Sequence, residues 1–164
     1  MKTLFVLRHA KSSWKDKELS DFDRPLKPRG RKVAETISAL FKRKRVNPDL
    51  ILSSPAVRAK ETIEIILQSV KLKGQLHFDE RIYEASANRL LEVVNQIQND
   101  VQSALIVGHN PGLEELIALC TGRNERMPTA ALAKIIFKTS NWTDAPNGAT
   151  LEWVVKPKEL EEDA

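Results

Sequence analysis

Short apolar runs alternate with helical patterns along most of this chain, and that alternation restricts the folds it can adopt. Four apolar runs are too short for helices and are typical of buried strands: residues 3–7, 50–53, 76–79 and 104–107. Helical periodicity follows them, at about 28–44, 54–70 and 88–99 and again from Asn110 onward. Strands that alternate with helices favour a three-layer α/β sandwich, in which helices cover both faces of a mostly parallel sheet.

The last part of the chain departs from this alternation. Two apolar segments, Leu132 to Phe137 and Thr150 to Val155, are predicted to be strands with no helix between them. Strands joined without a long crossover pair antiparallel, so we expect both at an edge of the sheet. The length of 164 residues fits a single domain over residues 1–164.

The composition is typical of a globular domain, with 41% hydrophobic and 29% charged residues. No apolar run approaches the length needed to span a membrane, and the segment from Met1 to Arg8 lacks the pattern of a secretory signal. Cys120 is the only cysteine, so no disulfide can form within the chain. We therefore expect a cytoplasmic protein with no membrane partner.

Basic residues are concentrated between Lys27 and Arg45, and the net charge of the chain is +4. The simplest interpretation of this stretch is the solvated face of one helix, and recognition of an anionic partner is the alternative. Neither a nucleic-acid-binding motif nor interleaved aromatic residues accompany it. Nucleic acid is therefore not the expected partner.

Three segments with polar and basic side chains follow predicted strands directly. Arg8 and His9 end the first strand, Ser53 to Arg58 follow the second, and Gly108-His109-Asn110 follow the fourth. In open α/β sheets, ligands bind beyond the carboxyl ends of the strands. We therefore expect four side chains to meet at one edge of the sheet, namely those of Arg8, His9, Arg58 and His109.

Arg58 carries an additional signal. Ser54 and Pro55 are typical of the cap and the first position of a helix, which places Arg58 about one turn inside it. A cation there is unfavourable beside the positive end of the helix dipole, by up to about 1 kcal/mol. A bound anion would remove this conflict, so we expect Arg58 to hold one; a solvated surface arginine is the alternative.

These residue types fit phosphoryl chemistry. Arginine forks onto phosphate oxygens, and a neutral imidazole is a good nucleophile toward phosphorus. Arg8, Arg58 and a protonated His109 would disfavour protonation of His9 and so keep it reactive near neutral pH. The three histidines, His9, His77 and His109, lack the spacing of metal ligands, so neither a metal nor another cofactor is expected.

The same segments carry a resemblance to a known family. Leu7-Arg8-His9-Ala10, Ser53 to Thr62 and Val107 to Pro111 are similar to motifs of the histidine phosphatase superfamily, the phosphoglycerate-mutase-like enzymes. Arg8 to Trp14 and Asp23 to Leu26 resemble its short SixA-type phosphohistidine phosphatases. The resemblance implies that His9 is the nucleophile and that the phosphoryl group is bound by Arg8, Arg58 and His109.

Two departures from the larger family members bear on the substrate. Ala10 stands where they have glycine, and residues 76–103 leave little room for the helical insertions that roof their sites. An unroofed site suits a phosphorylated protein side chain better than a small sugar phosphate. The general acid is expected at Glu84, where the superfamily often places it, and Asp21 and Asp23 are the alternatives.

The sequence therefore predicts a phosphatase that hydrolyses a phosphoryl group through a phosphohistidine intermediate on His9. Phosphohistidine proteins are the expected substrates, and a small-molecule phosphomonoesterase acting on a phosphate ester is the alternative among enzymes. A phospho-residue binding module is the non-enzymatic alternative, but a binding module has no need of His9 beside Arg8.

Overall fold

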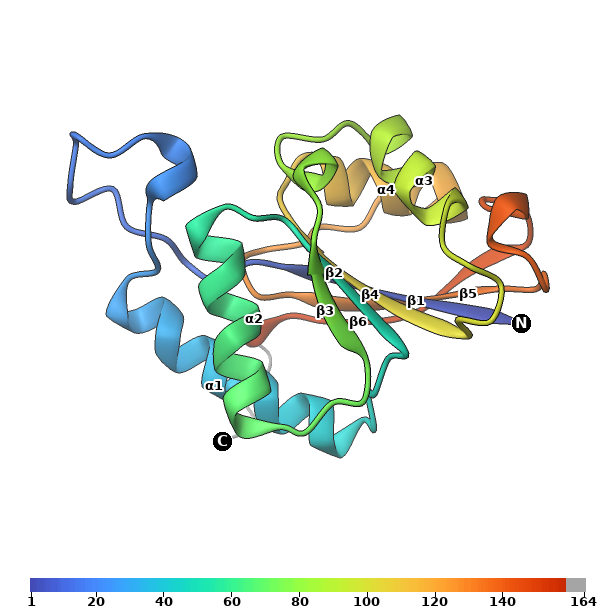
Figure 1. The fold of residues 1–164 in the computed structure, drawn as a ribbon, viewed down its shortest axis with the longest axis horizontal. Coiled ribbons are helices and arrows are strands. Elements are labelled where there is room, and N and C mark those ends of the chain that lie inside the picture. The colour runs from blue at the N-terminus through green and yellow to red at the C-terminus, as the bar shows by residue number, and fades with distance from the viewer. Residues whose placement is uncertain (159–164) are drawn as a thin grey trace.

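The computed structural model describes residues 1–158 and contains one mixed sheet with helices on both faces (Figure 1). Its strands are β1 (Lys2–Arg8), β2 (Leu50–Ser53), β3 (Gln75–Phe78), β4 (Ser103–Gly108), β5 (Leu132–Phe137) and β6 (Ala149–Val155). They follow the order β3-β2-β4-β1-β5-β6, parallel from β3 to β1 and antiparallel at β5 and β6. The predicted α/β sandwich with antiparallel edge strands is confirmed.

Four α-helices form the outer layers: α1 (Pro28–Arg43), α2 (Val57–Ser69), α3 (Ala87–Asn95) and α4 (Gly112–Thr121). Helices α1 and α2 cover one face of the sheet, and α3 and α4 cover the other (Figure 1). Side chains of β1 alternate between the two cores, with Leu4 and Val6 toward α3 and α4, and Phe5 and Leu7 toward α1 and α2. Burial of one such side chain contributes roughly 1.5 to 3 kcal/mol, so both faces of β1 stabilise the sandwich.

The sequence placed most elements correctly but misplaced several helix ends. The predicted start of α2 at Ser54 is wrong, because Ala56 is the cap and the helix begins at Val57. Ser54 still accepts a hydrogen bond from the Ala56 amide at 3.2 Å, but it does so from a turn before the helix. Similarly, α4 begins at Gly112 rather than Asn110, and α3 ends at Asn95 rather than about Asn99.

The chain segments that follow β1 and β4 leave the sheet on opposite faces, and a site can form between them at the carboxyl ends of the two strands. The chain leaves β1 toward α1 on one face, whereas it leaves the neighbouring β4 toward α4 on the opposite face. The register pairs Arg8 with Gly108, and the His9 amide donates to the Gly108 carbonyl at 3.1 Å. Ligands bind at such switch points, and here the two histidine-bearing segments flank it.

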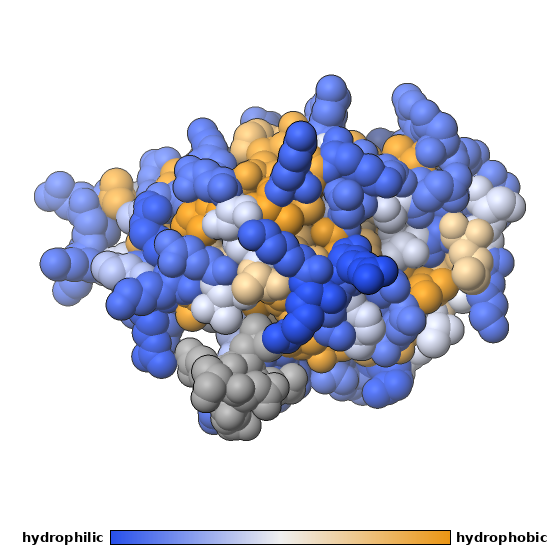
Figure 2. Space-filling model, turned by 90° about the horizontal axis from the view of Figure 1, so that it is seen from below, coloured by the Kyte–Doolittle hydropathy of each residue, from blue (hydrophilic) through white to orange (hydrophobic). Residues whose placement is uncertain are grey.

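The basic stretch follows the outer side of α1. Lys32, Lys42 and Arg43 are exposed, and Arg31 forms an ion pair with Glu61 of α2. Figure 2 looks onto the face that α1 covers and shows hydrophilic side chains over much of it, with apolar patches between them. This arrangement fits a solvated helix face, and recognition of an anionic partner stays a prediction.

Across residues 1–158, no helix combines the length and the apolar character needed to cross a membrane. Residues 159–164 of the predicted single domain lie outside the described part of the chain.

Candidate active site

A cleft of about 780 Å³ lies at the carboxyl ends of β1 and β4. The four side chains predicted to meet all line it, namely those of Arg8, His9, Arg58 and His109. The loop from residue 9 to residue 27 borders one side of the cleft, and the starts of α3 and α4 border the other. The juxtaposition expected from the sequence is therefore present. His77, in contrast, is exposed on β3 and does not line the cleft.

His9 is held in one ring orientation and one neutral tautomer. Its Nδ1 lies 2.6 Å from the carbonyl oxygen of Ala10, which can only accept a hydrogen bond. In the neutral ring Nδ1 therefore carries the proton, and Nε2 keeps its lone pair. Burial, reinforced by the charges of His109, Arg58 and Arg8, lowers the pKa of His9 to about 3. The expected neutral imidazole is thus found, with burial rather than neighbouring charge as its largest cause.

His109 lies beside His9, with 5.1 Å between the ring centroids. Its Nε2 is 2.7 Å from the hydroxyl oxygen of Ser54. Burial, followed by the charge of Arg58, lowers the pKa of His109 to about 4. Both rings are therefore neutral near pH 7, and the charge of His109 opposes protonation of His9 at the acidic pH where His109 is itself protonated.

Arg58 is the second residue of α2 and is 6% exposed, which excludes the surface alternative. Its Nη1 donates to the backbone carbonyl of Asp21 at 2.7 Å, and its Nη2 donates to the Asp21 carboxylate at 3.0 Å. The conflict between a cation and the helix dipole is thus reduced by an anion from the chain itself. The sequence indicated that Arg58 needs an anion but did not identify Asp21.

Asp21 joins three side chains at the edge of the cleft. Besides Arg58, Arg24 donates to its Oδ1 at 3.0 and 3.1 Å, and the Tyr83 hydroxyl donates to its Oδ2 at 2.6 Å. Partial burial opposes ionisation, but the hydrogen bonds from Tyr83 and Arg24 and the charge of Arg58 outweigh it and lower the pKa of Asp21 to about 2. Burial and the Asp21 carboxylate raise the pKa of Tyr83 to about 12. Asp21 is therefore a fixed anion that positions its neighbours.

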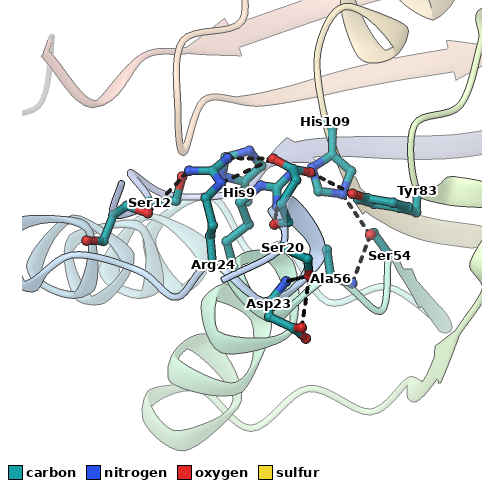
Figure 3. Close-up of polar contacts among 12 residues, drawn as sticks. His9, Ser12, Ser20, Asp23, Arg24, Ser54, Ala56, Tyr83 and His109 are labelled. Atoms are coloured by element: carbon teal, nitrogen blue, oxygen red, sulfur yellow. Dashed lines mark hydrogen bonds and ion pairs between the residues drawn. The ribbon is translucent and has the colours of Figure 1, made fainter. Parts of the chain in front are cut away.

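Figure 3 shows the order of these side chains across the site, with Ser12 and Arg24 on one side of His9, and His109 and Tyr83 on the other. Sequence reasoning assigned no role to Arg24 or Tyr83. The three-residue spacing of Asp21 and Arg24 within one loop was the available signal for Arg24. No comparable signal pointed to Tyr83, because its partner Asp21 is 62 residues away.

The three candidates for the general acid differ in position. Glu84 lines the cleft, is exposed, and adopts a left-handed backbone with φ of 51°. Such a conformation is uncommon for residues other than glycine, and it recurs at functional sites. Asp21 lines the cleft but is ionised and fully engaged. Asp23 is exposed, bonds Ser20 at 2.9 Å and is not part of the cleft lining.

A second set of contacts fixes Arg8. Its Nη1 donates to the carbonyl of Met127 at 3.1 Å. That backbone segment is held by the Glu114 carboxylate, which accepts from the Met127 amide at 3.0 Å and from Asn110 Nδ2 at 2.6 Å. The Asn110 side chain also donates to the Met127 carbonyl at 2.8 Å. Glu114 and Asn110 on the α4 side thus position the arginine that precedes His9.

Three buried side-chain nitrogens within the described residues have no hydrogen-bond partner: Arg8 Nε, Arg58 Nε and His109 Nδ1. All three belong to residues that line the cleft. An unpaired buried polar group costs roughly 1 to 3 kcal/mol, so this clustering indicates donors kept for a ligand oxygen. No group of side chains in residues 1–158 has the composition of a metal site, and a reaction without metal or cofactor stays a prediction.

Known proteins share both sequence and fold with this chain. The family model described as the histidine phosphatase superfamily (branch 1) matches residues 4–94, more than half of the sequence. A chloroplast protein of Arabidopsis thaliana is 30% identical over 94% of this chain and 77% of its own length. The phosphohistidine phosphatase SixA of Escherichia coli is 26% identical, with 96% of this chain and 95% of that protein covered. A solved structure of the protein histidine phosphatase SixA complexed with tungstate has the same fold, with a TM-score of 0.84 at 23% identity, covering 96% of this chain and 99% of the other.

Proposed function

Since the chain belongs to the histidine phosphatase superfamily, we propose that it is a phosphatase that takes a phosphoryl group onto His9 and then hydrolyses the phosphohistidine. The observation that carries the proposal is the state of the His9 ring. Its Nδ1 is committed to the Ala10 carbonyl at 2.6 Å, so the Nε2 lone pair of a neutral, buried imidazole is the available nucleophile.

In the first step, Nε2 of His9 attacks phosphorus. The bond from phosphorus to the leaving group breaks, and its electron pair stays with the leaving group. We assign Glu84 as the acid that protonates this group, because it lines the cleft and is neither buried nor ion-paired within residues 1–158. In the second step, water attacks phosphorus and gives a proton to Glu84, which is by then a carboxylate. The bond to Nε2 breaks with its electron pair returning to the ring, and inorganic phosphate leaves.

The unpartnered donors supply stabilisation for both steps. Arg8 Nε and Arg58 Nε are charged donors, and donors fixed in advance stabilise charge on the phosphoryl oxygens in the transition state. Because Arg58 holds Asp21 through its two Nη atoms, its Nε can serve the phosphoryl group while that fork stays in place.

His109 supplies a third donor in one of its neutral tautomers. The Ser54 hydroxyl accepts from the Ala56 amide and can also donate its hydrogen to His109 Nε2. The proton of the neutral His109 ring is then on Nδ1, the nitrogen without a partner. An approaching phosphoryl anion would also raise the pKa of His109, so the ring can gain a second proton as the charge arrives.

Phosphohistidine side chains of proteins are the proposed substrates. The similarity to proteins called phosphohistidine phosphatase supports this substrate class, and so does the open cleft. A location in the cytoplasm also stays a prediction, since the Arabidopsis relative is described as chloroplastic.

The direct test is a substrate panel. Turnover of a phosphohistidine peptide is compared with that of sugar and nucleotide monophosphates at equal concentration, for the wild-type protein and for His9→Ala. The proposal expects the highest kcat/KM on the peptide and no turnover by His9→Ala. His77→Ala, an exposed histidine outside the cleft, serves as the control and should keep wild-type rates. A clear preference for a sugar or nucleotide phosphate would instead support a small-molecule phosphomonoesterase.

A further inference from the structure

The two sides of the cleft carry opposite charge. On the side of the loop that follows β1, the mouth is lined by Lys11, Lys27 and Trp14, which we call the basic rim. On the side formed by the starts of α3 and α4, it is lined by Glu84 and Glu115. A substrate whose phosphoryl group sits at His9 therefore meets different electrostatic surroundings on its two sides.

The basic rim is held by contacts within the loop. The Trp14 ring lies over the Arg24 guanidinium, 3.4 Å from it, and remains 69% exposed at the mouth of the cleft. Arg24 is itself 6% exposed and donates to Ser12 at 2.8 Å as well as to Asp21. The Lys27 amide donates to the Lys11 carbonyl at 3.0 Å, so the backbones that carry the two lysines are joined.

The start of α1 packs against the same place. A side chain at Gly30 would collide with the Lys11 carbonyl, so only glycine allows this close approach. The backbone of the basic rim therefore packs against the first turn of α1, a 16-residue helix with no acidic residue in that turn.

The ammonium groups of the rim differ from the other cations nearby. Arg24 and Arg58 share the single carboxylate of Asp21, and Arg31 forms an ion pair with Glu61. Within residues 1–158, neither Lys11 nor Lys27 has a carboxylate partner for its ammonium group. These two charges are therefore free, in the described part of the chain, to attract an anion.

The positive surface also continues beyond the cleft. A second hollow of about 370 Å³ shares Lys11 and Thr129 with the cleft, and Arg29 and Lys158 line it further out. No carboxylate is among the described residues that line this hollow. Within residues 1–158, the path from the cleft across Lys11 into this hollow is therefore lined by cations and by no carboxylate.

We propose that the basic rim binds a second anionic group of the substrate, a carboxylate or phosphate on the same molecule as the phosphoryl group. The proposal rests on the phosphatase function proposed above and specifies its substrate class as phosphoryl compounds with an adjacent anion. Glu115, on the opposite side of the cleft, repels that anion, so the substrate lies with its second charge over Lys11 and Lys27. Trp14 then covers the uncharged part of the substrate between the two anions.

The first test uses two phosphohistidine peptides of the same length, one with glutamates beside the phosphohistidine and a twin with glutamines instead. Two exposed ion pairs would give the wild-type protein about a fivefold higher kcat/KM on the acidic peptide at low salt, decreasing as salt rises. Lys11→Ala/Lys27→Ala should bring the ratio between the peptides close to one. Lys11→Arg/Lys27→Arg should restore it, because the charges return.

The matched control is Lys42→Ala/Lys71→Ala, which removes the same charge from exposed positions near the ends of α1 and α2 that do not line the cleft. This variant should keep the wild-type ratio. A second arm compares a sugar bisphosphate with its monophosphate, which shows whether the second anion comes from a polypeptide or from a small molecule. A preference in either arm that depends on Lys11 and Lys27 supports the proposal.

Binding measurements separate this proposal from the phosphatase proposal. Calorimetric titration of His9→Ala with both peptides reports affinity in the absence of turnover, with and without the rim substitutions. If the wild-type protein hydrolysed none of the substrates, the proposed function would be wrong, whereas the ratio of the two affinities would still test the rim. Equal affinities and equal turnover within every pair would overturn the proposal, and so would a preference that Lys11→Ala/Lys27→Ala leaves unchanged.

Discussion

The buried, neutral His9 makes a quantitative prediction about stability at acidic pH. Its pKa is 6.5 in the unfolded chain and about 3 in the folded protein. Between these values the unfolded state binds more protons, so the contribution of His9 is fully present above pH 6.5 and is lost as pH falls toward 3. From about pH 7.5 to about pH 4.5 this linkage lowers the free energy of unfolding by about 2 to 3 kcal/mol.

The perturbation that isolates this effect is His9→Asn, which replaces the ring by a neutral amide that does not titrate. Urea unfolding of the wild-type protein and of His9→Asn is measured at both pH values. The wild-type protein should lose about 2 to 3 kcal/mol more stability on acidification than His9→Asn. Carboxylates also titrate in this interval, but they are common to both proteins and cancel in the difference.

His77→Asn is the matched control, because His77 is exposed on β3 and lies outside the cleft. Its loss of stability on acidification should equal that of the wild-type protein. Parallel losses for the wild-type protein and His9→Asn would refute the reasoning, since they would mean that His9 titrates similarly in the folded and unfolded states.

Three further predictions concern catalysis. Arg58→Lys should lower kcat/KM on an aryl phosphate at least about tenfold, because lysine supplies one point charge where arginine holds Asp21 by a fork and still offers Nε. Arg43→Lys, at an exposed site, should keep the wild-type value. An Arg58→Lys variant as active as the wild-type protein would contradict the role assigned to Arg58. Glu84→Gln should slow an alkyl phosphate more than an aryl phosphate, since only the poorer leaving group depends strongly on a proton; equal slowing of both would argue against Glu84 as the acid. Turnover should survive EDTA, and loss of activity that a divalent ion restores would show that a metal is required.

Much of the fold could be predicted because its signals are local. Buried strands such as β1 and β4 each contain a continuous apolar run, and Pro28 marks the start of α1. Parallel strands ending at one sheet edge also suffice to bring His9 and His109 together. The start of α2 was misplaced because the sequence signal of Ser54 and Pro55 is ambiguous. The Ser54 hydroxyl lies against His109, which is 55 residues away.

The parts of the site that were missed depend on long-range contacts. Asp21 reaches Arg58 from a loop without regular periodicity, and Tyr83 reaches Asp21 from a turn after β3. Neither contact leaves a pattern in the local sequence. The lowered pKa of His109 was not evident either, because the sequence indicates neighbouring charges but not the burial that is its largest cause.

The central claim is that His9 carries the phosphoryl group during turnover, and trapping that group tests it most directly. A phosphoramidate on histidine is stable in alkali and labile in acid, unlike a phosphate ester on serine. Rapid quenching in alkali during steady turnover of a radiolabelled substrate, followed by peptide mapping, should place the label on the peptide that contains His9. His9→Ala should yield neither label nor turnover, while His77→Ala should yield both. Substantial turnover by His9→Ala, or label found on another residue, would contradict the covalent mechanism and favour direct attack by water with His9 as a phosphate ligand.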